Sequence, residues 1–173
     1  MRALLATAGL ALVVAAPAFA ETPEEAVAYA FLGLADGATL ERSGTTIEWT
    51  ETAASPATFD GVAIIGGHRS NIRFIITATE DCRYEITLQG PANLVPGGSR
   101  LFGRVSLREI RDVRISETGY KSQIEGTGFC QTGQHNPSCM VARDPDLFGT
   151  VDLDRHRKMV AFLQDEVCVA TTQ

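Results

Sequence analysis

The alternation of apolar and polar side chains that begins near Thr45 is the feature that most limits how this chain can fold. Its clearest example is Ile72–Thr79, in which one face is entirely apolar, and Cys82–Gln89 repeats the pattern after Glu80 and Asp81. A period of two places alternate side chains on opposite faces of a β-strand. The two segments therefore predict an antiparallel hairpin with one dry face and one solvated face.

The same period predicts further short strands. We expect them near Ile47 and Trp49 and in Val62–Ile65, Leu101–Leu107, Val113–Ile115, Lys121–Thr127 and Cys139–Arg143. Proline and glycine predict loops at Ala53–Asp60 and Gly90–Ser99. Arg108–Asp112 breaks the alternation and indicates a tight turn, with a helix over Arg104–Arg114 as the competing interpretation.

A helix is expected near the start of the alternating region. Thr22 can cap it, Pro23 suits its first position and Glu25 completes a capping box. Gly37 is placed to end it. Its apolar stripe is narrow and consists of Val27, Ala30, Phe31 and Leu34.

A second helix, Leu153–Cys168, is expected near the end of the chain, with Asp152 as its cap. Its apolar stripe consists of Met159, Val160, Leu163 and Val167. Asp165 and Glu166 lie at the end where the helix dipole disfavours negative charge. The sequence offers no reason for this placement.

These elements predict an α+β fold: an N-terminal helix, about seven short strands in meander order and a closing helix. Strands joined by hairpins without helical crossovers form an antiparallel sheet. Seven strands are too many for one flat layer with a single dry face. We therefore expect a bent sheet or an open barrel, closed at one end by the last helix.

Seven meander strands followed by one C-terminal helix resemble the pleckstrin-homology-like barrel. The segment Val105–Ile115, followed by Cys130, Cys139 and a helix ending at Cys168, is similar to a layout found in small uncharacterised exported bacterial proteins. The resemblance covers about Thr45–Cys168 and implies a fold without an activity. The N-terminal helix departs from the plain barrel, so a cystatin-like sheet wrapped on a helix is the alternative.

The first 20 residues predict a cleavable signal peptide. Arg2 precedes the apolar segment Ala3–Ala16, Pro17 ends that segment, and Ala18–Ala20 forms a small-x-small cleavage site. An uncleaved membrane helix is the competing interpretation, but the acidic residues that follow disfavour it. We expect residues 21–173 to form a single globular domain in the periplasm, with secretion as the alternative and no membrane span after cleavage.

Four cysteines predict two disulfides in an exported chain. Three pairings are possible, and we favour Cys130–Cys139, which closes a small loop, and Cys82–Cys168, which ties the last helix to the sheet. Zinc held by the cysteines with His135 is the alternative. Zinc ligand pairs are usually two to four residues apart, so the spacing of Cys130 and Cys139 disfavours it. We expect no metal and no cofactor.

An arginine cluster stands out against an acidic chain. Residues 21–173 carry 14 basic and 21 acidic side chains, a formal charge of −7, which disfavours nucleic-acid binding. Ser99–Glu117 nevertheless holds five arginines: Arg100, Arg104, Arg108, Arg111 and Arg114. They predict either an anion site or, more commonly, a solvated strand face.

No catalytic motif is recognisable in the sequence. His68, after a glycine pair, is the one candidate general base, whereas His156 among charged residues suggests the surface and Trp49 suggests the core. The favoured function is a non-catalytic binding or adaptor domain for a protein partner or a small anionic ligand. The alternatives are a periplasmic hydrolase that uses His68 with a distant carboxylate, and a structural or inhibitor protein of the cell envelope, for example one that inserts Gln131–Ser138 into an enzyme.

Overall fold

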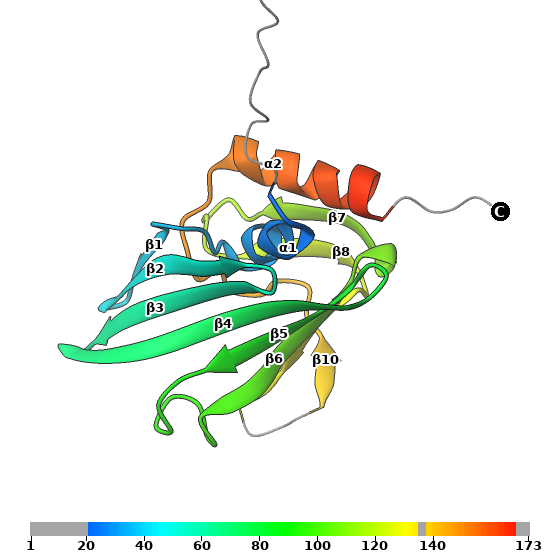
Figure 1. Cartoon of the computed structure of the whole chain (residues 1–173). Coiled ribbons are helices and arrows are strands. Elements are labelled where there is room, and N and C mark those ends of the chain that lie inside the picture. The colour runs from blue at the N-terminus through cyan, green and yellow to red at the C-terminus, as the bar shows by residue number, and fades with distance from the viewer. Residues whose placement is uncertain (1–20, 135–137, 169–173) are drawn as a thin grey trace, which may run out of the picture.

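The computed structural model describes residues 21–134 and 138–168, which contain two α-helices and ten β-strands (Figure 1). The elements are α1 (Pro23–Leu32), β1 (Thr39–Arg42), β2 (Thr45–Ala54), β3 (Ala57–Ile65), β4 (His68–Glu80), β5 (Arg83–Gln89), β6 (Ser99–Ser106), β7 (Ile110–Ile115), β8 (Ser122–Gly126), β9 (Phe129–Thr132), β10 (Cys139–Val141) and α2 (Leu153–Phe162). The predicted signal peptide, Met1–Ala20, lies outside the described residues, as does His135.

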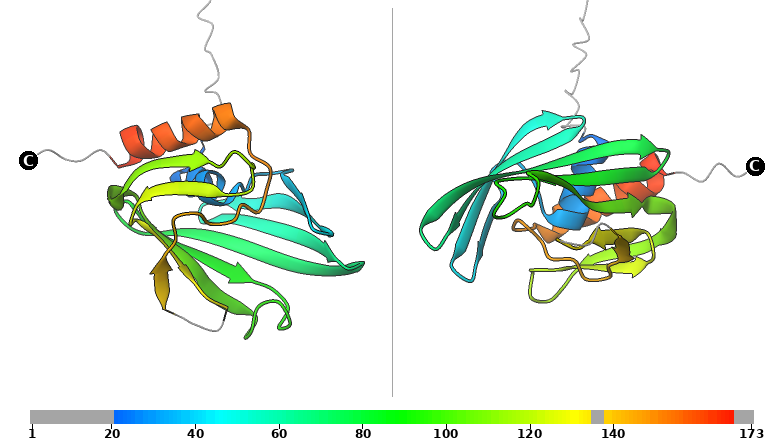
Figure 2. Two further views of the ribbon diagram at one scale, coloured as in Figure 1. Left: turned by 180° about the vertical axis from the view of Figure 1, so that it is seen from behind. Right: turned by 90° about the horizontal axis from the view of Figure 1, so that it is seen from below.

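The predicted α+β class and the antiparallel bent sheet are confirmed. Eight strands form one antiparallel sheet in the order β1-β2-β3-β4-β5-β6-β9-β10, and β7 and β8 form a separate pair. The large sheet does not close into a barrel. It curves around α1 instead, while β7, β8 and α2 cover the other side of that helix (Figures 1 and 2).

The position of α1 between these two layers explains its burial. Every residue from Ala26 to Leu32 is at most 3% exposed, so the predicted narrow stripe underestimated the apolar surface. A helix that contacts protein on all sides needs no polar face. The capping box of Thr22 and Glu25 is present, but the helix ends at Gly33, whose φ of 69° is left-handed, and not at Gly37.

The main error in the predicted strands concerns Pro56. Ala53–Asp60 was expected to be a loop, but β2 and β3 pair along their length and Pro56 occupies only the tight turn between them. Proline is compatible with such a turn because it removes no ladder hydrogen bond there. Two short edge or near-edge strands, β1 and β9, were not predicted.

The turn expected after β6 is a 3₁₀ turn at Leu107–Glu109, which leads directly into β7. The competing prediction of a helix over Arg104–Arg114 is therefore wrong. Gly90–Ser99 is a loop, as expected.

Trp49 lies in the core, as its position on the dry strand face predicted. It is fully buried, and its indole Nε1 donates a hydrogen bond to the carbonyl oxygen of Phe148 at 2.6 Å. Its ring lies 5.6 Å from that of Phe74, which also contacts Phe102 and Phe148. Trp49 therefore joins the sheet to the segment that precedes α2.

Both disulfides join the cysteines that the sequence favoured. Cys82 and Cys168 connect the turn between β4 and β5 to the end of the C-terminal helical segment, with their Cα atoms 5.6 Å apart. Cys130 and Cys139 connect β9 to β10, with a Cα separation of 5.3 Å. The first disulfide joins positions 86 residues apart, so it constrains the unfolded chain far more than the second does.

The last helix differs from its prediction in two ways. The α-helical part ends at Phe162, and a π-helical turn, Leu163–Val167, continues it to the disulfide. His156 is 2% exposed and not on the surface. Its Nε2 lies 3.1 Å from the carbonyl oxygen of Ala30, because α2 packs on α1 through the face that also carries Val160. Burial lowers the pKa of His156.

Among the helices in residues 21–134 and 138–168, none combines the length and the apolar character that a membrane crossing requires.

Candidate binding site

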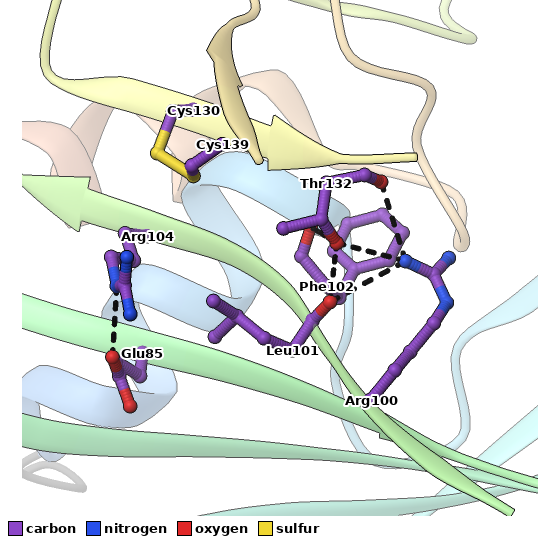
Figure 3. Close-up of a disulfide and its surroundings, with 8 residues drawn as sticks. All are labelled: Glu85, Arg100, Leu101, Phe102, Arg104, Cys130, Thr132 and Cys139. Atoms are coloured by element: carbon purple, nitrogen blue, oxygen red, sulfur yellow. Dashed lines mark hydrogen bonds and ion pairs between the residues drawn. A yellow bond between two sulfur atoms is a disulfide. The ribbon is translucent and has the colours of Figure 1, made fainter. Parts of the chain in front are cut away.

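The five arginines singled out from the sequence do not share one face. Arg100 and Arg104 are four residues apart on β6, a spacing that would place them on the same side of a regular strand. A bulge interrupts the pairing of β6 with β5, so that Phe102 has no partner across the ladder. The bulge reverses the order of faces, and the two arginines have separate sets of partners (Figure 3).

Arg100 turns towards the core and joins two strands. Its Nη1 donates hydrogen bonds to the hydroxyl and the carbonyl oxygen of Thr132, at 3.0 and 3.3 Å (Figure 3). The guanidinium lies over the ring of Phe102, 5.4 Å from its centroid. Partial burial lowers the pKa of this group. Arg100 therefore supports the contact between β6 and β9 instead of facing a ligand.

The other four arginines each lie close to a carboxylate. Arg104 pairs with Glu85 at 2.8 Å, Arg108 with Asp81 at 3.7 Å, Arg111 with Glu125 at 3.3 Å, and Arg114 with Asp112. All four arginine side chains are more than half exposed. Exposed pairs of this kind contribute only about 0–1 kcal/mol to stability. The local charge is nevertheless balanced, and this removes much of the attraction for an anion.

Only Arg111 and Arg114 come together in one depression. Both lie on β7, and with Arg143 and residues of β8 they border a shallow hollow of about 390 Å³. Three acidic residues, Asp112, Glu125 and Asp144, border the same hollow. The formal charge of this surface is therefore zero, which does not favour a site selective for anions.

The described structure gives no support to the residues on which the two alternative functions, hydrolase and inhibitor, depend. His68 is exposed at the start of β4, and within the described ranges no carboxylate is hydrogen-bonded to it. It therefore lacks the orienting partner that a general base of this type requires. The disulfide-closed segment Gln131–Ser138 lies partly outside the described residues, so its suggested inhibitory role stays a prediction.

A pair of carboxyl groups lies beside the N-terminus of α1. The carboxyl groups of Glu25 and Glu51 influence each other, and their interaction lowers the pKa of Glu25 and raises that of Glu51. Burial, the interaction with Glu25 and the nearby carboxylates of Asp36 and Glu21 raise the pKa of Glu51 to about 7. The amide of Thr22 is hydrogen-bonded to Glu25, so this carboxyl belongs to the helix cap. We therefore expect the stability of the start of α1 to depend on pH.

A further concave surface is a groove between β7 and α2, which the sequence analysis did not predict. It has a volume of about 440 Å³, within the range of about 300–1,000 Å³ that is typical of ligand pockets. Figures 1 and 2 show α2 extending alongside β7 above α1. Its apolar lining comes from two elements: Val113 and Ile115 on β7, and Leu153, Val160 and Ala161 on α2. Six polar or charged residues of β7, α2 and the π-helical turn complete it.

Leu153 is the residue through which sequence reasoning could have found this groove. It is the first residue of α2, lies outside the predicted stripe and is 57% exposed. The fold itself leaves more than half of this large aliphatic side chain uncovered, so burial in the core does not explain a leucine here. It instead extends the apolar lining of the groove to the molecular surface.

Comparisons of this chain with models of protein families, with curated proteins and with solved structures give no match in any of the three.

Proposed function

We propose that this chain is an exported, disulfide-stapled, non-catalytic binding domain that recognises a protein partner through the groove between β7 and α2. The observation that carries the proposal is the groove itself, a concave surface at which apolar side chains of β7 and α2 meet. Surfaces of this kind are found at protein interaction sites more often than elsewhere.

A protein partner fits these surfaces better than a small anion does. Four of the five arginines lie beside carboxylates, and the fifth is hydrogen-bonded to Thr132. An anion would have to compete with each of these contacts. The groove offers apolar area instead, and burial of apolar area is the main driving force of protein association.

The two disulfides support a compartment outside the reducing cytosol. Together with the predicted signal peptide at Met1–Ala20, they support export to the periplasm, with secretion as the alternative. The likeness to small exported bacterial proteins with a pleckstrin-homology-like layout agrees with a location in the periplasm and remains part of the proposal.

Site-specific photocrosslinking tests the proposal. A photoreactive residue replaces Ala161, which is exposed and lines the groove, and the protein is expressed with its own leader in its own host. We expect one discrete adduct that weakens strongly when Leu153 is replaced by glutamate. Leu153→Glu removes apolar contact area, while an acidic residue in the first turn of α2 is compatible with the helix dipole.

A second variant serves as the matched control. Arg104→Ala/Arg108→Ala alters the exposed arginines outside the groove and should leave the adduct unchanged. If the adduct is insensitive to Leu153→Glu and is lost in the arginine variant, the arginine surface is the site and the groove is not. A complete absence of adducts at Ala161 would also contradict the proposal.

A further inference from the structure

One edge of β7 is available for pairing with another strand, and it faces the groove. The amides of Ser122 and Ile124 in β8 donate to the carbonyl oxygens of Pro145 and Arg143, at 3.0 and 2.7 Å, and so point away from β7. In an antiparallel pair, two residues directly opposite each other either both direct their backbone N–H and C=O groups towards the partner strand or both direct them away from it. Ser122 and Ile124 lie opposite Ile115 and Val113. The backbone groups of these two β7 residues therefore point outward from the pair.

A contact on β7 itself shows that outward means towards the groove. The carbonyl oxygen of Arg111 accepts a hydrogen bond from Nε2 of Gln164 at 3.1 Å, and Gln164 belongs to the helical segment that borders the groove. Val113 and Ile115 follow Arg111 at alternate positions of the same strand. Their outward groups consequently lie along the same side of β7.

Three of these outward groups have no partner. The amide of Val113 is hydrogen-bonded to the side chain of Asp112 at 2.9 Å. Within residues 21–134 and 138–168, no donor or acceptor is hydrogen-bonded to the carbonyl oxygen of Val113 or to the amide and carbonyl oxygen of Ile115. Unpaired strand edges of this kind are templates for the addition of another strand.

The charges around the groove indicate which peptides would fit. Arg114 and Arg157 border it, but each is paired with an aspartate, Asp112 and Asp154 respectively. Asp165 also borders the groove, and none of the described ion pairs includes it.

The negative charge of Asp165 lies at the C-terminal end of the helical segment, where the last turn of α2 holds no basic residue. The helix dipole is negative at the same end, so this part of the groove favours a cation. The position of Asp165 at the negative end of the helix dipole lowers the stability of the isolated domain. A basic ligand would offset that cost.

We propose that the groove binds an extended peptide segment of a protein partner, which adds to β7 as a third strand. The peptide places an aliphatic side chain against Ile115 and Leu153, the accessible aliphatic residues of the lining, and a lysine or arginine near Asp165. This inference rests on the proposed function and specifies how the partner is recognised. Main-chain bonds to Val113 and Ile115 supply register, and the apolar contact and the cation supply selectivity.

A synthetic peptide of alternating character tests this mode directly. The probe is acetyl-Lys-Val-Thr-Val-Lys-Val-Thr-amide, titrated into the disulfide-bonded protein and followed by two-dimensional amide NMR. We expect chemical-shift changes confined to β7 and α2, and slower hydrogen exchange of the Ile115 amide. A peptide with glutamate in place of both lysines should bind about tenfold more weakly, and Asp165→Asn should reduce this discrimination.

Two independent changes test the main-chain bonds. Ile115→Pro removes the outward amide without removing a bond to β8, and edge strands tolerate proline. We expect it to weaken binding about tenfold, whereas Ile115→Val, which keeps the amide, should bind within about twofold of the original protein. N-methylation of alternate peptide residues should abolish binding in one register and not in the other, and this measurement does not depend on the folding of a variant.

The outcomes separate this inference from the function on which it rests. If crosslinking at Ala161 depends on Leu153 but the peptide binds equally well to Ile115→Pro and to Ile115→Val, the groove is an interaction site and strand addition is wrong. Peptide-induced shifts centred on Arg111 and Arg143 at the hollow on β7 and β8 would also overturn it, as would an absence of binding at millimolar peptide. Loss of the crosslink in addition would overturn both proposals.

Discussion

Replacement of Gly61 by alanine tests how tightly the core holds Trp49. Gly61 in β3 lies directly opposite Trp49 in β2. A Cβ atom at position 61 would lie 2.6, 2.8 and 2.9 Å from Cζ3, Cε3 and Cη2 of the indole ring. The φ angle of Gly61 is not in the left-handed region, so the backbone itself accepts alanine. Only the ring opposes the substitution.

The ring has no room to retreat. Trp49 is fully buried, its Nε1 is hydrogen-bonded to the carbonyl oxygen of Phe148, and its ring lies against that of Phe74. Forcing an extra methyl group into a packed core costs about 1–3 kcal/mol. In an uncrowded strand the same change from glycine to alanine would instead stabilise by roughly 0.5–1 kcal/mol. We therefore expect Gly61→Ala to lower the free energy of unfolding by about 2 kcal/mol.

Urea unfolding followed by circular dichroism measures this effect in a double-mutant cycle with Trp49→Phe. Phenylalanine lacks the ring atoms that the new methyl group would meet. In that background Gly61→Ala should be neutral or slightly stabilising, and the difference between backgrounds is the energy of the clash. The reasoning is refuted if Gly61→Ala stabilises the original protein or costs the same in both backgrounds.

Three further predictions concern the disulfide, the carboxyl pair and the exposed arginines. Replacing Cys82 and Cys168 together by serine should cost up to about 4–5 kcal/mol in thermal unfolding, because the disulfide closes a long loop; a loss below about 1 kcal/mol would contradict this. Because the pKa of Glu51 in the folded protein, about 7, exceeds the ordinary glutamate pKa of 4.5, its contribution to stability is present below pH 4.5 and lost as the pH rises through 7. The free energy of unfolding of Glu51→Gln, relative to that of the original protein, should therefore rise by about 1–2 kcal/mol from pH 4 to pH 8, a figure reduced for the partial exposure of Glu51. An equal effect of the substitution at both pH values would refute the raised pKa of Glu51. Arg104→Ala should change stability by less than about 1 kcal/mol, and this small effect should shrink further in 1 M salt; a larger loss would show that the exposed pair is structural.

Sequence patterns were most successful where neighbouring segments pair with each other. The hairpin of β4 and β5 was predicted because both strands alternate in period two and the turn lies between them. The cap of α1 was predicted because Thr22 and Glu25 are three residues apart. Interactions of this range depend on nearby residues alone, so a local pattern is sufficient to reveal them.

The prediction that the five arginines form an anion site has no support from the structure, for a reason that no local sequence pattern reveals. Regular alternation would have placed Arg100 and Arg104 on one face, but the bulge opposite Ile86 and Thr87 reverses the order within β6. The bulge depends on how β6 fits its neighbours. The carboxylates that neutralise the arginines come from several elements, among them Glu85 on β5 and Glu125 on β8.

The sequence by itself determined the class of the fold, the main hairpins and the core position of Trp49, because each follows from periodicity or turn chemistry. Among three possible pairings of the cysteines it favoured the one that the structure contains. Only the tertiary structure decided which faces are covered. His156 is buried by Ala30, 126 residues away, and Trp49 is bound to Phe148, 99 residues away. The groove likewise exists only because α2 lies beside β7. Burial and clefts are properties of how distant segments meet, and these meetings depend on the packing of the whole domain.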